Sequence, residues 1–208
     1  MGGWALLAPA GGAAQVRLGA DGGASYLEYR VDGSAGIERF SGLGASLGVA
    51  LTAGRRAELR LAGAVGRLSA STAGALDRDL TQAMADVSVR LAPWFTATAG
   101  LAVRGFQTAA ARQRWTTVHA GGEVRVPFLG RGVHGVLQAA YLPVVAVAGL
   151  GRLGLAFTAG AGVEYRLPPG GLRVLYALER YAFAPPGGSR RPEQLSSLTV
   201  ALRTRGLR

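Results

Sequence analysis

The chain has 208 residues, 49% of them hydrophobic, so it can form one domain of barrel size and is apolar for a soluble protein. No window approaches the roughly 18 uninterrupted apolar residues of a membrane-spanning helix, which excludes that class. Cysteine is absent, which excludes disulfides and thiolate sites. The net charge of +11 comes mainly from arginines scattered along the chain, without a dense basic run interleaved with aromatics, and this argues against nucleic-acid binding.

Residues 1–14, MGGWALLAPAGGAA, resemble the tail of a secretory signal peptide. A short apolar patch at Trp4–Ala8 precedes small residues of the kind found at cleavage sites. The basic segment that normally begins a signal peptide is missing, and the apolar patch is short. We expect either a remnant of a signal peptide, with the true start upstream, or a flexible arm, and we treat residues 15–208 as a single domain.

Apolar residues alternate with small or polar ones along most of the chain, which is the period of a strand with two unlike faces. The first predicted strand is Ala24–Val31, with a possible extension back to Val16 across a bulge at Asp21–Gly23. The other predicted strands follow in order at about residues 39–53, 58–66, 86–91, 95–104, 117–128, 133–141, 152–167, 172–183 and 197–203.

The longest alternation lies at residues 152–167 and continues after Pro168–Gly171, which can close a four-residue turn. In that register Leu167 faces Leu172. One face of the hairpin is aliphatic and aromatic, and the other consists of Gly, Ala and Thr with charges set among them. In a soluble barrel the apolar face lies inside, but the Gly- and Ala-rich face here is typical of a narrow wet lumen, so we expect the aliphatic face outside.

The ten predicted strands are joined by connections of two alternating kinds. Short connections lie at residues 54–56, 92–93, 129–132 and 168–171, and mostly longer ones at 32–38, 69–82, 107–114, 142–151 and 184–193. The 33 glycines fit turns and lumen-facing strand positions better than helices. The sequence therefore predicts an all-β fold, a closed antiparallel up-and-down transmembrane β-barrel of about ten strands, with both termini on the short-turn side.

Aromatic residues gather near the two ends of the predicted strands, as in the interfacial girdles of a membrane barrel. The group near the short turns is Trp94, Phe128, Tyr165 and Tyr176. The group near the long connections is Phe40, Phe106, Trp115, Tyr141, Tyr181 and Phe183. A general preference of aromatics for strand ends is the alternative explanation.

The architecture and alternation of residues 24–204 resemble the small outer-membrane β-barrel proteins of Gram-negative bacteria. The resemblance implies localisation in the outer membrane, contact with its lipids and with lipopolysaccharide, and insertion by the barrel assembly machinery. Arginines suit lipopolysaccharide phosphates. Such proteins usually finish on an aromatic residue, whereas this chain ends Thr204-Arg205-Gly206-Leu207-Arg208. Either Leu202 is the effective end of the strand, or the assembly route differs, or the barrel interpretation is wrong.

Charged residues on the lumen face form the candidate site, which we name the lumen charge network. Three Glu-x-Arg repeats beside short turns predict a ring of ion pairs that plugs the lumen or sets the charge selectivity of a narrow pore. The predicted members are Glu58, Arg60, Asp86, Arg90, Arg104, Glu123, Arg125, Glu164, Arg166, Arg173, Glu179 and Arg203.

Two histidines are available for catalysis or metal binding, and we expect neither. His119 and His134 point inward near opposite rims in the predicted register, so they cannot share a metal or a catalytic dyad. His119 with a nearby residue such as Ser69, Ser71, Asp77, Asp79 or Thr117 could imitate the outer-rim sites of omptin proteases or lipid A palmitoyltransferases, but the spacing does not require it. No glycine-rich phosphate loop is present, and no cofactor is expected.

The sequence thus predicts a non-catalytic outer-membrane barrel with a structural, surface-interaction or narrow-pore role for small solutes. One alternative is an outer-membrane enzyme acting on lipid or peptide at the outer rim. The other is a soluble lipid carrier of the lipocalin kind, with the aliphatic face inside.

Overall fold

The computed structural model describes residues 16–33, 36–54, 56–130, 132–147, 152–167, 170–184 and 191–204. The segment at residues 1–14, predicted as a signal-peptide remnant or arm, and residues 205–208 lie outside these ranges. None of the described residues forms a helix long and apolar enough to cross a membrane.

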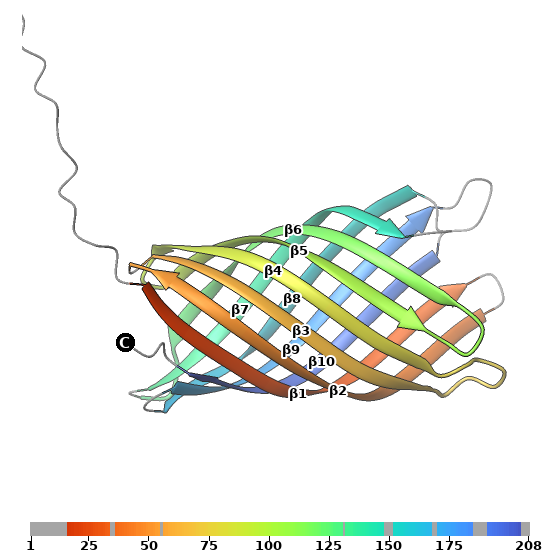
Figure 1. The fold of residues 1–208 in the computed structure, drawn as a ribbon, viewed down its shortest axis with the longest axis horizontal. Helices are drawn as coiled ribbons and strands as arrows, with labels where there is room; N and C mark the ends of the chain where they lie inside the picture. Colours follow the sequence, from red (N-terminus) through yellow and green to blue (C-terminus); the bar gives the residue numbers. More distant parts are fainter. Residues whose placement is uncertain are drawn as a thin grey trace, which may run out of the picture.

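The described chain forms a closed antiparallel barrel in which every strand pairs with its neighbours in sequence and β1 pairs with β10 (Figure 1). The strands are β1 (Val16–Gly33), β2 (Gly36–Ala53), β3 (Ala57–Ala70), β4 (Arg78–Ala92), β5 (Phe95–Gln107), β6 (Arg112–Pro127), β7 (Val133–Val147), β8 (Arg152–Leu167), β9 (Gly170–Ala184) and β10 (Arg191–Thr204). The predicted ten-strand transmembrane barrel is confirmed. β1 begins and β10 ends at the end of the barrel that carries the tight turns, which we call the turn end; the opposite end is the loop end.

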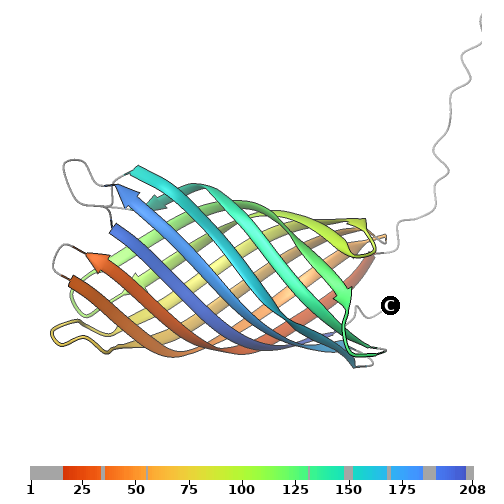
Figure 2. The same cartoon turned by 180° about the vertical axis from the view of Figure 1, so that it is seen from behind.

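The strands are strongly tilted. The tilt follows from the register of the strand pairs. A path that starts at Val16 of β1 and passes from each residue to its paired residue on the next strand returns to β1 at Glu28, which is a stagger of about 12 residues. With ten strands about 4.8 Å apart, this stagger corresponds to a tilt of about 40° and a backbone radius of about 10 Å. Figure 2 shows the same tilt on the opposite wall, where β6 to β10 lie side by side. A barrel of this radius has little interior space beyond its own side chains.

The outer wall carries an uncharged apolar belt. Along β1 the outward residues from Val16 to Tyr26 are uncharged, and the side chains of Leu43 and Leu47 on β2 are 73% and 75% exposed. The belt ends where outward charges begin near the loop end, at Glu28, Arg39, Arg67, Asp79, Arg114 and Arg180. Ten tilted residues span about 25 Å, which is the height of the lipid-facing band of outer-membrane barrels. Because the aliphatic face lies outside, the lipocalin-like alternative is wrong.

Several strands extend further towards the loop end than the sequence pattern predicts. The predicted loop at 32–38 is wrong, since Gly33 pairs directly with Gly36, whose φ of 125° favours glycine. The predicted bulge at Asp21–Gly23 is also absent, because β1 and β2 pair in one continuous register. The predicted apolar loop from Leu142 is wrong as well: β7 continues to Val147 past a register shift. The shift lets Pro143, which has no N–H to donate, remain within the strand.

The register of the β8–β9 hairpin differs from the predicted one by two residues. Leu167 faces Gly170 rather than Leu172, because Gly170 and Gly171 join β9 and extend the strand pair. A shift of two residues keeps every side chain on its predicted face. It also brings Glu164 opposite Arg173, where the predicted register placed Leu175. The true register therefore pairs opposite charges across the hairpin.

Candidate functional site in the barrel interior

The interior has two regions of different chemistry. Inward positions near the turn end and the middle of the barrel carry charged and amide side chains, while inward positions near the loop end carry aromatic and aliphatic ones. The lumen charge network lies in the first region. The second, which we call the aromatic cluster, was not predicted.

Glu123 on β6 is the centre of the turn-end part of the lumen charge network. Its Oε1 accepts a hydrogen bond from Arg125 Nε at 2.6 Å, and its Oε2 accepts one from Arg173 Nη2 at 2.7 Å. Arg125 Nη2 also lies 3.5 Å from Glu164 Oε2. The side chains of Glu123 and Glu164 are 15% and 17% exposed, so each carboxylate depends on these cations for its charge balance.

Two further ion pairs cross the turn-end part of the lumen. Arg60 donates to both carboxylate oxygens of Asp21, from Nε at 3.0 Å and Nη2 at 2.5 Å, and Arg203 donates to Glu58. A Cβ at Gly48 would lie 2.9 Å from Asp21 Oδ1, so a larger residue there would force this ion pair to shift. The predicted Glu58–Arg60 repeat therefore does not pair with itself, because each side chain finds a partner on another strand.

Arg104 on β5 holds a second group near mid-barrel. Its Nη2 donates to Glu179 Oε1 at 2.9 Å and its Nε donates to Gln82 Oε1 at 2.9 Å. The Tyr181 hydroxyl donates to Glu179 Oε2 at 2.5 Å. Because β5 and β9 are not neighbours, the Arg104–Glu179 pair crosses the lumen.

Asp86 and His119 form the remaining contact of the lumen charge network. Asp86 Oδ1 lies 3.0 Å from His119 Nε2, although the two groups are not aligned as a hydrogen bond. A Cβ at Gly100 would lie 2.2 Å from Asp86 Oδ1, so glycine makes space for this contact. Among the partners considered for His119, Ser69, Ser71, Asp77 and Asp79 are exposed, and the Thr117 hydroxyl lies 3.4 Å from the Ala102 carbonyl. The structure does not gather the enzyme-like group that was the alternative for His119.

Two predicted members do not join the lumen charge network. Arg90 and Arg166 are exposed, and neither forms an ion pair with any residue in the described part of the chain. They lie at the turn-end rim, where water solvates a guanidinium and no partner is needed. The sequence pattern missed Asp21, because it was assigned to a bulge, and it missed the amides Gln82 and Gln138, which serve as uncharged acceptors for Arg104 and Arg173.

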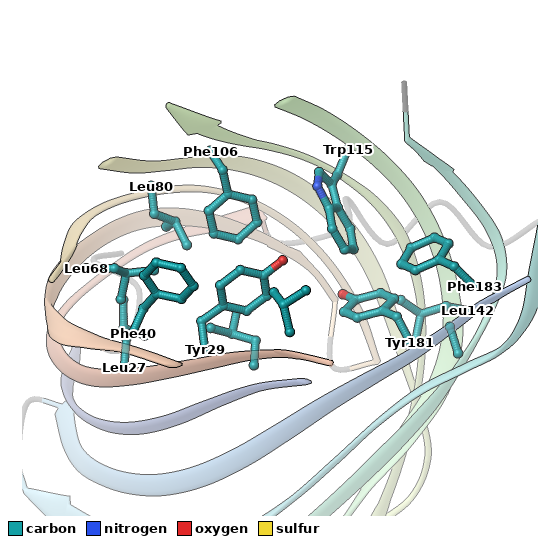
Figure 3. Packing of buried hydrophobic residues seen from close by; sticks show 13 residues of the cluster. Leu27, Tyr29, Phe40, Leu68, Leu80, Phe106, Trp115, Leu142, Tyr181 and Phe183 are labelled. Atoms are coloured by element: carbon teal, nitrogen blue, oxygen red, sulfur yellow. The ribbon is translucent and has the colours of Figure 1, made fainter. Parts of the chain in front are cut away.

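The aromatic cluster fills the loop-end part of the lumen (Figure 3). Tyr29 of β1 stacks on Phe106 of β5 with ring centroids 4.8 Å apart, and Phe106 meets Trp115 edge-on at 5.9 Å. Trp115 in turn packs edge-on against Tyr181 at 4.9 Å and Phe183 at 5.4 Å. Since β1 and β5 are not neighbours, and neither are β6 and β9, this chain of rings crosses the barrel from wall to wall.

Polar groups cover the loop-end side of the aromatic cluster. The Arg78 guanidinium carbon lies 4.0 Å above the centre of the Phe40 ring, within cation–π range. The Tyr29 hydroxyl donates to Glu193, which also lies 2.8 Å from Arg191 Nε. Glu193 is 1% exposed and pairs with Val31 across the seam between β1 and β10. These contacts close the barrel at the position where its first and last strands meet.

The aromatic cluster corrects part of the predicted girdles. Phe40, Phe106 and Trp115 are 1–3% exposed and face the lumen instead of lipid, as do Tyr181 and Phe183. They lie beyond the apolar belt, at a level where the outer wall is charged and the interior is the drier environment for a ring. The other predicted girdle residues are exposed: Tyr141, Tyr165 and Tyr176 lie on the outer wall, and Trp94 and Phe128 lie in the connections at the turn end.

Within the described residues, no group of three or more His, Asp or Glu side chains is placed to hold a metal ion. Searches against protein-family models and curated protein sequences found no match.

Several solved structures align with most of this chain. The translocator domain of the autotransporter NalP from Neisseria meningitidis aligns with a TM-score of 0.51 and 13% identity over 91% of this chain and 88% of that one. Neisserial surface protein A aligns with a TM-score of 0.43 and 12% identity over 92% of this chain and 99% of that one. The transport unit of the autotransporter AIDA-I from Escherichia coli gives a TM-score of 0.42 and 12% identity over 98% of this chain and 94% of that one.

The chain has the fold of an outer-membrane β-barrel. The closed ten-strand sheet, the apolar belt on its outer wall and the likeness to the NalP barrel agree on this fold.

Proposed function

We propose that this outer-membrane barrel is non-catalytic and closed, and that it serves as a structural element of the membrane with a surface for interaction at its loop end. The single observation that carries the proposal is the aromatic cluster across the lumen. Its rings are 1–3% exposed, which leaves little space for water between them. A solute would have to displace these rings and then the ion pairs below them.

The same cluster weighs against an enzyme at the outer rim. His119 and Asp86 are the histidine–carboxylate pair that the described residues bring together, and both lie on the turn-end side of the rings. A lipid or peptide arriving from the loop end would meet the aromatic cluster first. The Asp86–His119 contact is better explained as part of the charge balance of the lumen.

The apolar belt supports continuous contact with membrane lipids, and the exposed arginines above it suit the phosphates of lipopolysaccharide. Insertion of such a barrel by the barrel assembly machinery belongs to the same proposal. Passage of a small solute is the opposing outcome, which a conductance measurement separates from closure.

The test is conductance of the purified protein in a planar bilayer, with heat-dependent gel mobility as the check that each variant is folded. We expect no steady conductance from the wild type and stable openings from the Phe106→Ala/Trp115→Ala double variant. The matched control is Trp94→Ala/Phe128→Ala, which removes two exposed rings at the turn end and should stay closed. Steady channels from the folded wild type would overturn the proposal and favour the narrow pore.

A further inference from the structure

A groove with a volume of about 900 Å³ runs over the outer wall of the barrel across β2 to β6. Its floor consists of small residues from adjacent strands: Gly63 pairs with Ala83, and Thr81 pairs with Gly105. Strand alternation directs these positions outward, so the groove faces the membrane rather than the lumen. Its volume lies within the range of sites for small molecules, about 300–1,000 Å³.

The sides of the groove are apolar. Leu47 and Val65 line it, with side chains that are 75% and 60% exposed, and Val103 lines it from β5. All three lie in the apolar belt, where the surrounding solvent is lipid. A hollow of this kind, with glycine and alanine beneath and branched aliphatic side chains beside it, offers an apolar surface to a hydrocarbon chain.

The loop-end limit of the groove carries two arginines. Arg114 of β6 pairs with Gly105 of β5. Arg112 lies two residues earlier in β6, on the same face and nearer the loop end. Both are exposed, and neither forms an ion pair or a side-chain hydrogen bond with another residue of the described chain.

Two other outward arginines at this level have acidic neighbours, whereas Arg39 and Arg180 form no ion pair within the described chain. Arg30 forms an ion pair with Asp32 at 2.7 Å, and Arg67 lies 3.9 Å from Asp77. Asp79, on β4 of the groove floor, pairs in register with Arg67. Arg112 and Arg114 differ from these arginines in lying together, two residues apart on one face, where the groove leaves the apolar belt.

We propose that this groove binds a phosphorylated, acylated glycolipid of the lipopolysaccharide type from the outer leaflet. One acyl chain lies over Gly63 and Ala83, and a headgroup phosphate is held by Arg112 and Arg114. Arginine binds phosphate in a bidentate geometry, and the surrounding apolar wall strengthens the attraction. The inference deepens the lipid contact proposed above by assigning it to one place on the wall, and it rests on the loop end facing the outer leaflet.

The test is titration of the purified barrel in detergent micelles with bisphosphorylated lipid A, followed by native mass spectrometry of the intact complex. We expect a saturable single lipid adduct on the wild type. The Arg112→Gln/Arg114→Gln variant should bind at least about 10-fold more weakly. Ala83→Leu, which fills the floor of the groove, should also lose binding while keeping both arginines.

Two matched controls separate this site from general attraction to the barrel. Arg180→Gln removes an exposed arginine at the loop end of β9, and Ala139→Leu enlarges an exposed alanine on the outer wall of β7. Both should bind lipid A like the wild type. Equal losses in the controls, or wild-type binding by Arg112→Gln/Arg114→Gln or Ala83→Leu, would overturn the site.

Comparing lipids with different headgroups identifies the class of lipid that the groove binds. Dephosphorylated lipid A and zwitterionic phosphatidylethanolamine should bind at least about 10-fold more weakly than bisphosphorylated lipid A. Equal binding of phosphatidylglycerol would overturn the assignment to a glycolipid, and equal binding of dephosphorylated lipid A would overturn the role of the phosphate. Because none of these results alters the conductance of the lumen, failure of the groove and failure of the closed-barrel proposal are separate outcomes.

Discussion

Replacing Trp115 with alanine tests the central claim that the loop-end rings fill the lumen. The indole is 1% exposed and touches Phe106, Tyr181 and Phe183. Removing it deletes about 140 Å³ of side chain, which at about 24 cal/mol per Å³ of cavity costs about 3.4 kcal/mol. Lost edge-on ring contacts can add to this, so we expect the free energy of unfolding to fall by about 3–5 kcal/mol.

Trp115→Phe provides the graded comparison. The indole Nε1 has no hydrogen-bond partner among the described residues, so phenylalanine removes part of the ring without breaking a polar contact. We expect a loss of about 1–2 kcal/mol. The measurement is reversible urea unfolding in lipid vesicles, followed by far-ultraviolet circular dichroism because the substitution removes a fluorophore.

A fluorescence experiment decides independently where the ring lies. In a Trp4→Phe/Trp94→Phe background, Trp115 is the remaining tryptophan, and lipids with brominated acyl chains should leave its emission nearly unchanged. The counterpart that keeps Trp94 alone should be quenched, since that side chain belongs to the predicted turn-end girdle and is 56% exposed. Strong quenching of Trp115, together with a Trp115→Ala loss below about 1 kcal/mol, would refute the interior placement and restore the predicted girdle.

Three further substitutions test the polar interior and the strand seam, each by the same unfolding measurement. Glu123→Gln removes the carboxylate shared by two arginines and should lower the free energy of unfolding by about 2–3 kcal/mol. The control Arg166→Gln, at the solvated rim, should change it by less than about 0.5 kcal/mol. Equal effects of the two substitutions would contradict the lumen charge network. Gly100→Ala forces a Cβ against a carboxylate oxygen of Asp86 and should lower the free energy of unfolding by about 2–3 kcal/mol. Gly63→Ala should be tolerated, because the atom nearest to its new Cβ would lie 3.6 Å away. A tolerated Gly100→Ala would show that the Asp86–His119 contact can relax. Tyr29→Phe withdraws the hydroxyl donor from a buried carboxylate and should cost about 1–3 kcal/mol, and an unchanged unfolding midpoint would mean that the carboxylate is solvated instead.

The strand pattern alone predicted much of this fold, because a period of two specifies both the faces and their environments. Leu47 falls on the aliphatic face of β2 and Glu123 on the opposite kind of face of β6, and lipid and lumen sort them accordingly. The β8–β9 register was wrong by two residues without disturbing that sorting, since a shift of two preserves the faces. Register depends on where a turn closes, and Gly170 could belong to either turn or strand.

The girdle prediction failed for a different physical reason. Phe40 lies on the same face of its strand as Gly44 and Ser46, and Phe106 lies on the same face as Arg104. The alternation itself therefore places these rings inside the barrel. The girdle prediction relied on aromatic character and on position near a strand end, and not on which face of the strand each ring occupies. The interior partners of the lumen charge network were less accessible to prediction, because the Arg104–Glu179 contact depends on how the closed barrel brings β5 and β9 face to face.

The aromatic cluster also bears on how the barrel forms. Its contacts join β1 to β5 and β6 to β9, strands that are not neighbours, so they become available only as the sheet curls towards the closed barrel. Hairpins inserting one after another would gain their local strand pairs early and these long-range contacts late. Contacts absent from the transition state for folding act mainly by slowing unfolding. Separating the β1–β10 seam would then break the ring contacts together with the strand pair, which makes the closed barrel kinetically resistant to lateral opening.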